Sequence, residues 1–268
     1  MPLTHPDTWP GHSELEPGTC CFGPFCAPGA VLSLEPRGTL LYLHWRAQTP
    51  ADLLAALQQA ESALRPQAYD LYIEFVPPEF EAPLLASGFQ PHSEFVDAWI
   101  RDLDAVDLGR ANPAVRPARQ ADIYSAAAIT RACAGASRGF NGETAEWAAG
   151  WLAKPENAVF LAWDGDQPVG VVFCALYHAS SRNTEVCWVR ELAVLPSCSG
   201  RGFGRALTLA ALRWGRERGA GMSFLAVDRE NANAIHLYES IGYCLDPGRG
   251  QVNLIKKWLA ADEHNIVT

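Results

Sequence analysis

"SGRGFGRAL", residues 199–207, decides the fold because it joins the end of one regular element to the start of another. Its three glycines alternate with larger residues, two of which are arginines. Bare backbone that runs into an apolar helix directs several unpaired N–H groups at one point, where the helix dipole also favours an anion. Arg201 and Arg205 can add charge-assisted hydrogen bonds. The stretch therefore predicts a site for a diphosphate group.

Regular elements are predicted on both sides of this loop. A strand with alternating apolar residues precedes it and is closed by Pro196. A helix follows from residue 204 to 218 and ends at Gly219. Further strands are expected at 157–164, 167–177, 222–227 and 251–259, and further helices at 120–135, 143–154 and 231–242, with Asp122 as a helix cap. Helices and strands thus alternate around one mixed sheet, an α/β fold.

The amino-acid sequence excludes two common nucleotide-binding motifs. The chain has no G-K-[ST] triplet, so it lacks a Walker lysine. The dinucleotide fingerprint needs its third glycine at position 205, where this chain has arginine.

The loop and a second motif together resemble a known family. "RELAVLPSCSGRGFGRALTLAAL" (190–212) followed by "DRENANAIHLYESIGY" (228–243) is similar to the GNAT superfamily of acetyl-CoA dependent N-acetyltransferases, and the resemblance covers residues 115–258. In that family a Q/R-x-x-G-x-G/A loop binds the coenzyme A pyrophosphate, and an N-x-x-A-x-x-x-Y helix completes the site. Ser199 departs from the pattern, because the family has Gln or Arg at the start of the loop.

The resemblance implies a role for each matching residue. The main chain of one strand would pair with the pantetheine amides, the loop would hold the pyrophosphate, Asn231 would contact the pantetheine arm, and Tyr238 would protonate the departing thiolate. The expected cofactor-binding residues are Leu192, Ala193, Val194, Gly200, Arg201, Gly202, Phe203, Gly204, Arg205 and Asn231. The expected catalytic residue is Tyr238, acetyl-CoA is the expected co-substrate, and no metal is expected.

Structural roles compete with these assignments. Tyr238 could be a core residue, Asn231 a helix cap, and Leu192 and Val194 part of the sheet core. His236 and His178 are interpreted as packing or loop residues rather than catalysts. A metal site from Cys20, Cys21, Cys26 and His12 is weighed against ordinary thiols, which their irregular spacing favours.

The general base is left unassigned. An amine with a pKa near 10.4 is about 99.9% protonated at pH 7, so a base or a water chain must take its proton. Many GNAT enzymes place a carboxylate on the strand before the loop, at an even offset from the coenzyme-binding residue. Those positions are Arg190 and Trp188 here, whereas Glu191 and Glu185 have the opposite parity. A β-bulge, common on this strand in the family, would reverse that.

The first half of the chain repeats the order strand, loop, helix, strand, helix, Gly-aromatic. In it "AQTPAD" (47–52) stands in place of the glycine loop, and Leu84 stands at the tyrosine position before Gly88-Phe89. We interpret residues 1–112 as a degenerate GNAT-like domain without the cofactor loop, similar in plan to tandem GNAT proteins. An unrelated α/β segment is the alternative.

Composition limits the class of protein and its partners. The chain has 268 residues, 49% hydrophobic residues and a net charge of −9, which argues against nucleic acid as a partner. Residues 1–113 hold five Arg and fifteen Asp or Glu, so the first half is strongly acidic. That acidity either steers a cationic amine or only aids solubility. No apolar run is long enough for a membrane span and no C-x-x-C pair occurs among eight Cys, so a cytoplasmic location is expected.

The prediction is two GNAT-like domains, each with a central mixed sheet flanked by helices, the N-terminal one truncated. Residues 1–112 form the degenerate domain, 113–260 the catalytic domain and 261–268 a tail. The expected function is transfer of acetyl from acetyl-CoA to a primary amine of a small molecule or peptide, by direct attack in a ternary complex. The alternative is a non-catalytic acyl-CoA-binding regulatory module. The acceptor, the acyl-chain length and the oligomeric state stay open.

Overall fold

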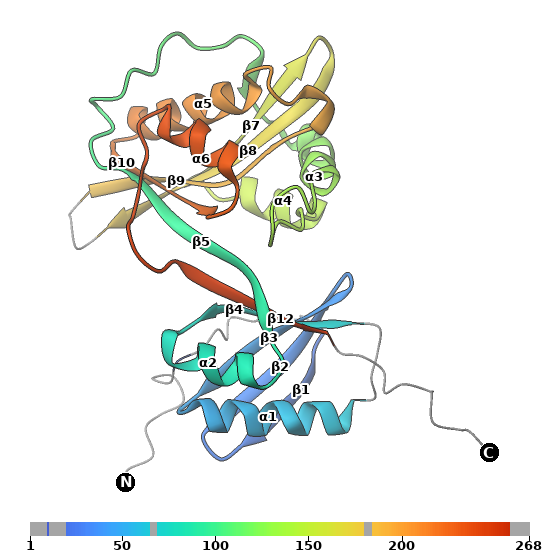
Figure 1. Cartoon of the computed structure of the whole chain (residues 1–268). Helices are drawn as coiled ribbons and strands as arrows, with labels where there is room; N and C mark the ends of the chain where they lie inside the picture. Colours follow the sequence, from blue (N-terminus) through green and yellow to red (C-terminus); the bar gives the residue numbers. More distant parts are fainter. Residues whose placement is uncertain (1–9, 11–19, 65–68, 180–183, 258–268) are drawn as a thin grey trace. The chain divides into compact units, whose positions relative to one another are not determined.

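The computed structural model describes residues 10, 20–64, 69–179 and 184–257. The chain forms two compact units (Figure 1). The first unit combines residues 1–94 with residues 251–268, and the second unit is formed by residues 95–250. The predicted tail at 261–268 lies outside the described residues.

The second unit is built on a mixed sheet. From one edge its strands are β6 (Val115–Pro117), β7 (Asn157–Asp164), β8 (Gln167–Ala179), β9 (Thr184–Val194), β10 (Ala220–Asp228), the second half of β5 (Gln90–Ile100) and β11 (Cys244–Leu245). Neighbouring strands are antiparallel except β9 and β10, which are parallel. The one parallel pair is joined by a helix, as a parallel connection requires.

Helices cover both faces of this sheet. Alternate residues of β8 show the two faces: Val172 and Cys174 belong to one hydrophobic cluster, Val171 and Phe173 to the other. The first cluster contains residues of α5 (Phe203–Glu217) and α6 (Ala232–Glu239), and the second contains residues of α3 (Ile123–Ala132) and α4 (Ala145–Leu152). Short 3₁₀ turns, η2 (Gln120–Asp122) and η3 (Pro196–Cys198), precede α3 and the glycine-rich loop.

Glycines bring α5 unusually close to the sheet. A Cβ added at Gly215 would lie 2.5 Å from the Cβ of Cys187 on β9. A Cβ at Gly170 on β8 would lie 2.9 Å from Leu207 of α5. Since real Cβ atoms do not approach each other so closely, Gly215 is needed to make room for Cys187, whereas at Gly170 the end of the Leu207 side chain would have to shift. The last turn of α5 therefore packs closely on β9, and an earlier turn packs closely on β8.

The strands of the first unit are also of mixed direction, and they share β5 with the strands of the second unit. The strands of the first unit follow the order β1 (Phe22–Ala27), β2 (Ala30–Arg37), β3 (Leu40–Ala47), β4 (Asp70–Val76), β12 (Gln251–Lys257) and the first half of β5. Strands β3 and β4 are parallel, whereas β1 and β2, β2 and β3, and β4 and β12 pair antiparallel. Helices α1 (Pro50–Ala63) and α2 (Pro78–Ala86) pack residues such as Leu53, Leu57 and Phe80 into its core.

The division of the chain differs from the predicted one. We expected a boundary near 110–115, whereas the first unit ends at Glu94 and resumes at Gln251. Strand β5 is continuous across Glu94 and Phe95, and the segment after it packs Leu103 and Leu108 into the core of the second unit. The last strand, expected in the second half, pairs with β4 of the first unit. Residues 102–114 have the composition of a loop, and for that reason the sequence predicted a domain boundary there. In the structure this segment is anchored to the second unit by packing.

Most elements of the second half match their predicted type and place. Helices α3 to α6 and strands β7 to β10 lie where the sequence predicts them, while the short strands β6 and β11 were not predicted. Asp122 is the N-cap residue of α3, as predicted, but its carboxylate accepts from the backbone N–H of Arg119 and makes no capping hydrogen bond to the helix. No helix in the described ranges is long and apolar enough to cross a membrane.

Candidate functional site

A gap opens between β9 and β10 next to the glycine loop, residues 199–205. Among the described residues these parallel strands pair only from Ala220↔Glu185 to Phe224↔Trp188. Beyond that point β9 continues to Val194 and β10 to Asp228, and each keeps its other neighbour, β8 or β5. The backbone of β9 from residue 189 to 194 therefore has one edge without a strand partner. An extended ligand can occupy such an edge.

The glycine loop lies at the end of this gap. Gly200 and Gly202 have φ of 74° and 83°, and a Cβ at either position would meet no atom within 4 Å. Gly202 is the N-cap of α5 and provides no side-chain cap, so the first turn keeps its unpaired amides. In the described part of the chain no acceptor contacts the backbone N–H groups of residues 200–205. Left-handed glycines, open space and unpaired donors fit an anion such as a diphosphate.

The other residues of the loop have packing or polar partners. Gly204 lies against α6, since a Cβ there would be 3.2 Å from Leu237. The guanidinium of Arg201 donates to both carboxylate oxygens of Asp164 at 2.6 and 3.0 Å and lies over the ring of Phe203. Arg205 donates to the carbonyl and the hydroxyl of Ser240. Arg201 is thus neutralised by a carboxylate, whereas Arg205 is positioned by neutral acceptors.

The three residues expected to pair with pantetheine lie along the edge of the gap. Leu192 packs against the α5 side of the sheet and Ala193 against the α3 side, each opposite a residue of β8. The carbonyl of Val194 accepts from the thiol of Cys133 at 3.3 Å. The packing roles weighed for these side chains are therefore real, and they leave the main-chain assignment untested.

A β-bulge in β9 changes the face on which Glu191 lies. The register jumps from Phe173↔Glu191 to Cys174↔Val189, so Arg190 is the extra residue. Glu191 consequently shares a face with Phe173 and, across the bulge, with Trp188. On a regular strand Glu191 and Trp188 would lie on opposite faces. The bulge that the resemblance to the GNAT family offered as the alternative is present, and it reverses the face of Glu191.

Glu191 is a nearly enclosed carboxylate. Its side chain is 18% exposed, and its nearest charge is Arg190, 3.1 Å away, which also contacts Glu143 at 2.8 Å. Arg190 lies over the rings of Trp147, 4.3 Å away, and Trp151, 5.4 Å away. Burial raises the pKa of Glu191 to about 7, Arg190 opposes the rise and Glu143 adds to it. A carboxylate that titrates near neutrality can accept a proton.

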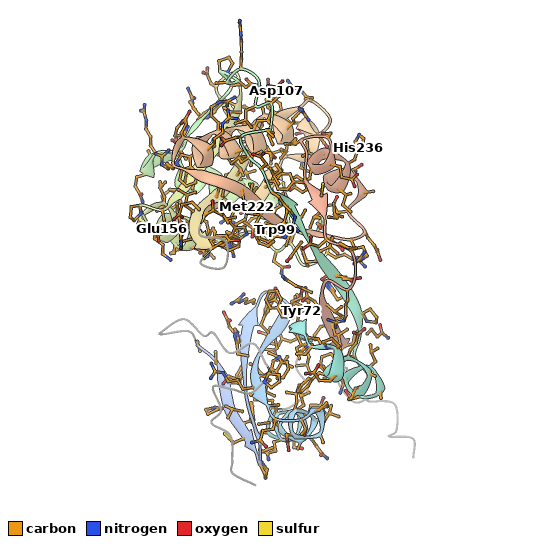
Figure 2. The ribbon with its side chains drawn as sticks, turned by 90° about the vertical axis from the view of Figure 1, so that its left-hand side faces the viewer. Tyr72, Trp99, Asp107, Glu156, Met222 and His236 are labelled. Atoms are coloured by element: carbon orange, nitrogen blue, oxygen red, sulfur yellow. The ribbon has the colours of Figure 1, made fainter. Side chains whose placement is uncertain are left out.

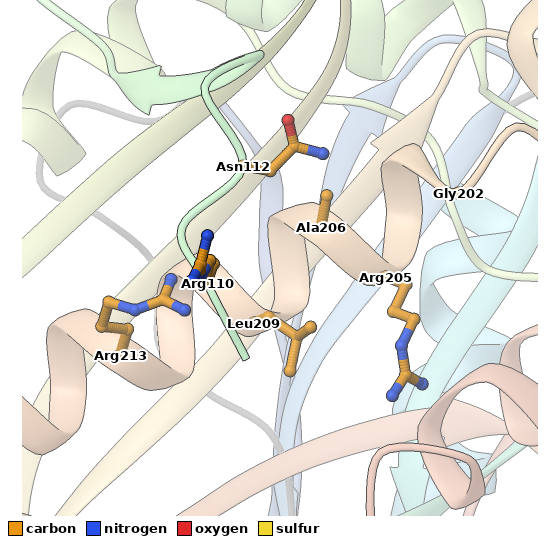
Figure 3. Close-up of a pocket in the computed structure, with 7 residues that line it drawn as sticks. All are labelled: Arg110, Asn112, Gly202, Arg205, Ala206, Leu209 and Arg213. Carbon is orange, nitrogen blue, oxygen red and sulfur yellow. The ribbon is translucent and has the colours of Figure 1, made fainter. Parts of the chain in front are cut away.

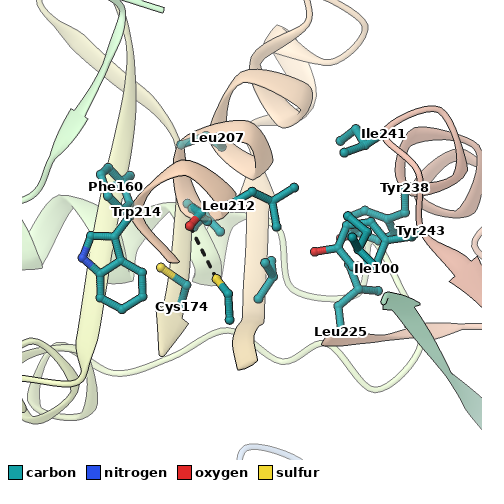
Figure 4. Packing of buried hydrophobic residues seen from close by; sticks show 14 of the residues in the cluster. Ile100, Phe160, Cys174, Leu207, Leu212, Trp214, Leu225, Tyr238, Ile241 and Tyr243 are labelled. Carbon is teal, nitrogen blue, oxygen red and sulfur yellow. Dashed lines mark hydrogen bonds between the residues drawn. The ribbon is translucent and has the colours of Figure 1, made fainter. Parts of the chain in front are cut away.

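The charge of Glu191 affects the pKa of Tyr238. Its side chain belongs to the α5 core, is 7% exposed and meets the ring of Tyr243 edge-on (Figure 4). Burial, with a smaller effect of the Glu191 charge, raises the pKa of Tyr238 well above its usual range. The hydroxyl therefore keeps its proton and can act as a donor. Tyr243 differs, because its hydroxyl is already bonded to Ser223 at 2.7 Å.

Asn231 has the structural role that competed with its predicted one. Its side-chain oxygen caps α6 by accepting from the N–H of Ala234. It also lines a pocket of about 370 Å³ at the end of β10. In this pocket the guanidinium of Arg138 is held by Asp228, which is 3% exposed, and by Glu230.

The histidines and cysteines have other surroundings. His236 is exposed on α6 (Figure 2), and His178 pairs with Glu185 at 2.9 Å. All eight cysteines are free thiols. In the described ranges no group of three or more His, Cys, Asp or Glu side chains could hold a metal ion, and His12 lies outside those ranges.

Comparisons with known proteins agree with this geometry. Residues 125–243 match the acetyltransferase (GNAT) family. An uncharacterized N-acetyltransferase of Methanocaldococcus jannaschii is 32% identical over 117 residues, 43% of this chain and 49% of that protein. A mycothiol acetyltransferase of Rhodococcus erythropolis is 32% identical over 99 residues, 36% of this chain and 32% of that protein. The matched stretch spans about half or less of these relatives.

Solved structures are similar over a longer part of the chain. A GCN5-related N-acetyltransferase from Sphaerobacter thermophilus aligns with a TM-score of 0.58 at 16% identity, covering 86% of this chain and 77% of that one. Another from Kribbella flavida has a TM-score of 0.55 at 18% identity and covers 86% of this chain and 88% of that one. At these identities the likeness concerns the fold.

The gap between β9 and β10, the glycine loop and the family match define the class: residues 125–243 form a GNAT acetyltransferase domain, that is, an acyltransferase domain. More particularly, the relatives that match this stretch carry the name N-acetyltransferase or mycothiol acetyltransferase.

Proposed function

We propose that the protein transfers acetyl from acetyl-CoA to a primary amine. The observation that carries the proposal is the gap between β9 and β10, with the glycine loop at its end and Glu191 and Tyr238 beside it. The loop fits the diphosphate, because its N–H groups are unpaired and its glycines leave open space. The backbone edge at 192–194 fits an amide-containing arm. When bound, acetyl-CoA supplies an activated acyl group as a thioester.

The residues of the chain supply the proton transfers. We assign Glu191 as the base that takes a proton from the incoming ammonium group, directly or through one water. Its pKa of about 7 suits this role, since both protonation states are populated at neutral pH. The amine nitrogen then forms the new C–N bond as the C–S bond breaks. Tyr238 donates its hydroxyl proton to the departing sulfur. The nitrogen, now bonded to the acetyl carbon, gives up its second proton to the Tyr238 oxygen, directly or through water, and Glu191 releases the first proton to solvent.

Direct attack in a ternary complex needs no covalent enzyme intermediate. Cys187 and Cys198 lie on the same strand–loop segment, but Cys187 is fully buried and its thiol donates to the carbonyl of Ala211. Cys198 is buried behind the loop, near Arg201 and Ser197. Neither has a base positioned to activate it. Positioning the amine against the thioester supplies much of the rate in this scheme.

The acceptor belongs to the amines, and we propose that it enters on the α3–α4 face. Glu191, Glu143 and the rings of Trp147 and Trp151 gather there, around Arg190. The pocket beside Asp228 and Glu230 adds two more carboxylates. Acidic surroundings favour an ammonium-bearing acceptor over an anionic one. A small molecule and a peptide N-terminus both satisfy this chemistry.

We further propose that the first unit is a GNAT-like domain without a coenzyme site. Its parallel pair, β3 and β4, is aligned only from Leu40↔Asp70 to Tyr42↔Tyr72 although β3 runs on to Ala47. A helix, a strand and a second helix follow in the same order as in the second unit. At its counterpart of the glycine loop, Thr49 and Asp52 cap the start of α1. A cytoplasmic location remains part of the proposal, and eight free thiols are compatible with a reducing compartment.

The proposal is tested by thiol release from acetyl-CoA with panels of amines, together with calorimetric titration of CoA. We expect binding of one CoA per chain and release of thiol with at least one amine class. Binding without thiol release from any amine, and with no effect of Tyr238→Phe, would instead identify a coenzyme-binding regulatory module. No CoA binding at all would reject both.

A further inference from the structure

A pocket of about 210 Å³ lies on the outer side of α5, away from the gap where acetyl transfer is proposed (Figure 3). Its floor is one stripe of the helix, and its rim is the segment that joins β5 to β6. The lining residues are Arg110, Asn112, Gly202, Arg205, Ala206, Leu209 and Arg213. Three of these seven residues carry a guanidinium group.

The charge of this pocket is not neutralised within the chain. Arg213 donates to the carbonyls of Leu108 and Gly109, and Arg205 donates to the carbonyl and hydroxyl of Ser240. In the described part of the chain none of Arg110, Arg205 and Arg213 forms an ion pair with a carboxylate. Neutral acceptors fix the guanidinium groups of Arg205 and Arg213, and all three arginines keep their positive charge and several of their five donors available. Arg201, on the neighbouring loop, contrasts with them because Asp164 neutralises it.

The rim is held in place by packing and hydrogen bonds. Arg213 and Arg216 of α5 donate to carbonyls at Val106, Leu108 and Gly109. Leu103 and Leu108 are buried in the core beneath. The oxygen of the Asn112 side chain accepts from the N–H of Ala114, which orients its amide. The segment that the sequence suggested as a plain linker is therefore an ordered wall of the pocket.

The pocket is continuous with the glycine loop, because Gly202 and Arg205 belong to both. From Gly202 to Leu209 the helix rises about 10 Å, so a ligand held at the loop can reach the floor of the pocket. Three unneutralised guanidinium groups select a doubly charged phosphate monoester over a neutral group. The occupant should thus carry a diphosphate and, a few bonds away, a further phosphate.

We propose that this pocket binds the 3′-phosphate of the ribose of coenzyme A and makes the protein discriminate against 3′-dephospho-CoA. The inference rests on the proposed function, which supplies CoA as ligand. It adds a recognition site with Arg110 and Arg213 as specificity-determining residues. A separate small phosphate monoester has the same chemistry, and the experiment distinguishes the two sources.

The experiment is calorimetric titration of the full-length protein with CoA and with 3′-dephospho-CoA, each with and without added inorganic phosphate. We expect CoA to bind about 10- to 100-fold more tightly, the ratio expected from one or two charge-assisted hydrogen bonds. The ratio should shrink as salt screens the charges. Inorganic phosphate should compete weakly with CoA and leave dephospho-CoA unaffected.

Variants locate the effect. Arg110→Gln, which breaks no contact within the described residues, should bring the CoA to dephospho-CoA ratio close to one by weakening CoA alone. Arg213→Gln should do the same, with some loosening of the rim. Arg218→Gln, at the opposite end of α5 and stacked on Trp214, is the charge-matched control and should keep the ratio. A merely structural effect would weaken both ligands equally.

Each outcome decides a different question. Equal affinity for CoA and dephospho-CoA in the unaltered protein overturns the inference while the proposed function stands. If Arg110→Gln and Arg213→Gln still bind CoA more tightly than 3′-dephospho-CoA by the original ratio, this pocket is not the site that recognises the 3′-phosphate, and the inference is overturned. Phosphate that binds tightly at the pocket without competing with CoA identifies a separate ligand and also overturns the inference. Failure of either nucleotide to bind rejects the proposed function itself.

Discussion

The N-terminus of α1 in the first unit and that of α5 in the second follow the same kind of parallel strand, yet they treat their unpaired amides in opposite ways. In α1, Thr49 and Asp52 form a capping box, with Asp52 Oδ2 accepting from Thr49 N at 3.1 Å and the Thr49 hydroxyl accepting from Asp52 N. In α5, Gly202 provides no side-chain acceptor and has a left-handed backbone.

The difference shows what separates a structural helix start from a ligand site. The Asp52 carboxylate occupies the place of an external anion, and a Cβ at Gly29 would lie 2.8 Å from it. One helix satisfies its donors internally and gains stability of about 1 kcal/mol from its cap. The other leaves its donors to a ligand. Substitutions at the start of α5 and at the start of α1 can both test this difference.

The largest effect is expected from Gly202→Glu. The new side chain adds a carboxylate to the anion site and a Cβ at a φ of 83°, so CoA should bind at least about 1000-fold more weakly, the loss of two or more charge-assisted hydrogen bonds. Calorimetry measures the affinity and thermal melting the fold. Gly219→Glu is the matched control, because Gly219 also has a left-handed φ, 89°, and open space, at the other end of α5. Unchanged affinity in Gly202→Glu would refute the diphosphate site.

Glu191→Gln should reduce kcat about 100-fold, because the amide cannot accept the proton of the ammonium group. In the unaltered protein the rate should rise with pH through about 7 as the carboxylate forms, and this rise should vanish in the variant. Steady-state rates from pH 5.5 to 8.5 measure both effects. Glu185→Gln removes a carboxylate from the same strand, at an exposed site beside His178, and should leave kcat unchanged. If Glu191→Gln has the same pH–rate profile as the unaltered protein, Glu191 is not the base.

Tyr238→Phe should lower kcat about tenfold or more with little change in CoA affinity, since the hydroxyl acts only as sulfur departs. Tyr243→Phe is the comparison, because it removes a buried hydroxyl that bonds Ser223 and should cost about 1 kcal/mol of stability instead of rate. Thiol-release kinetics and denaturant unfolding separate the two. Equal kcat in Tyr238→Phe and the unaltered protein would remove Tyr238 from the mechanism.

Glu191 also links pH to stability. Its pKa of about 7 in the folded chain exceeds the ordinary value of 4.5, so the folded state binds this proton more tightly than the unfolded state does. The resulting stability is present below about pH 4.5 and is lost as pH rises to 7. Glu191→Gln should therefore be more stable than the unaltered protein at pH 8, by about 1–3 kcal/mol. A lower unfolding free energy of the variant at pH 8 would contradict this.

The smallest effect is expected from removing the cap of α1. Asp52→Ala should cost about 1 kcal/mol of stability and leave the CoA affinity and the stoichiometry of one per chain unchanged. The segment directly before α1, residues 47–49, contains no glycine, unlike the loop before α5, so freeing the amides of α1 does not create a site. A second bound CoA in Asp52→Ala would show that the cap alone blocks the first unit.

The sequence predicted the second unit better than the first, for physical reasons. Glycine spacing before α5 and the motif around Asn231 and Tyr238 are local patterns, and the elements that they predict are present. The exchange of strands at the two ends of the chain depends on pairing between residues far apart, such as Val252 and Val76. No local pattern encodes such pairing.

The candidate base shows the same limit at a finer scale. The base stayed unassigned because strand parity directs Glu191 away unless a bulge intervenes, and one extra residue, Arg190, provides that bulge. The pocket with Arg110 and Arg213 had no sequence signal, since its wall is a segment of turn-forming residues 100 positions from the helix. Only folding brings these charges together.

The passage of the chain through β5 into the second unit, and its return at Gln251, has a consequence for dissecting the gene. A fragment starting at residue 113 would lack residues 95–100 and leave both β10 and β11 without their shared neighbour, a long exposed edge prone to self-association. A fragment ending at residue 112 would lose β12 from beside β4. Neither half is an independent building block, so a recombination event that transplants one of them must carry the other.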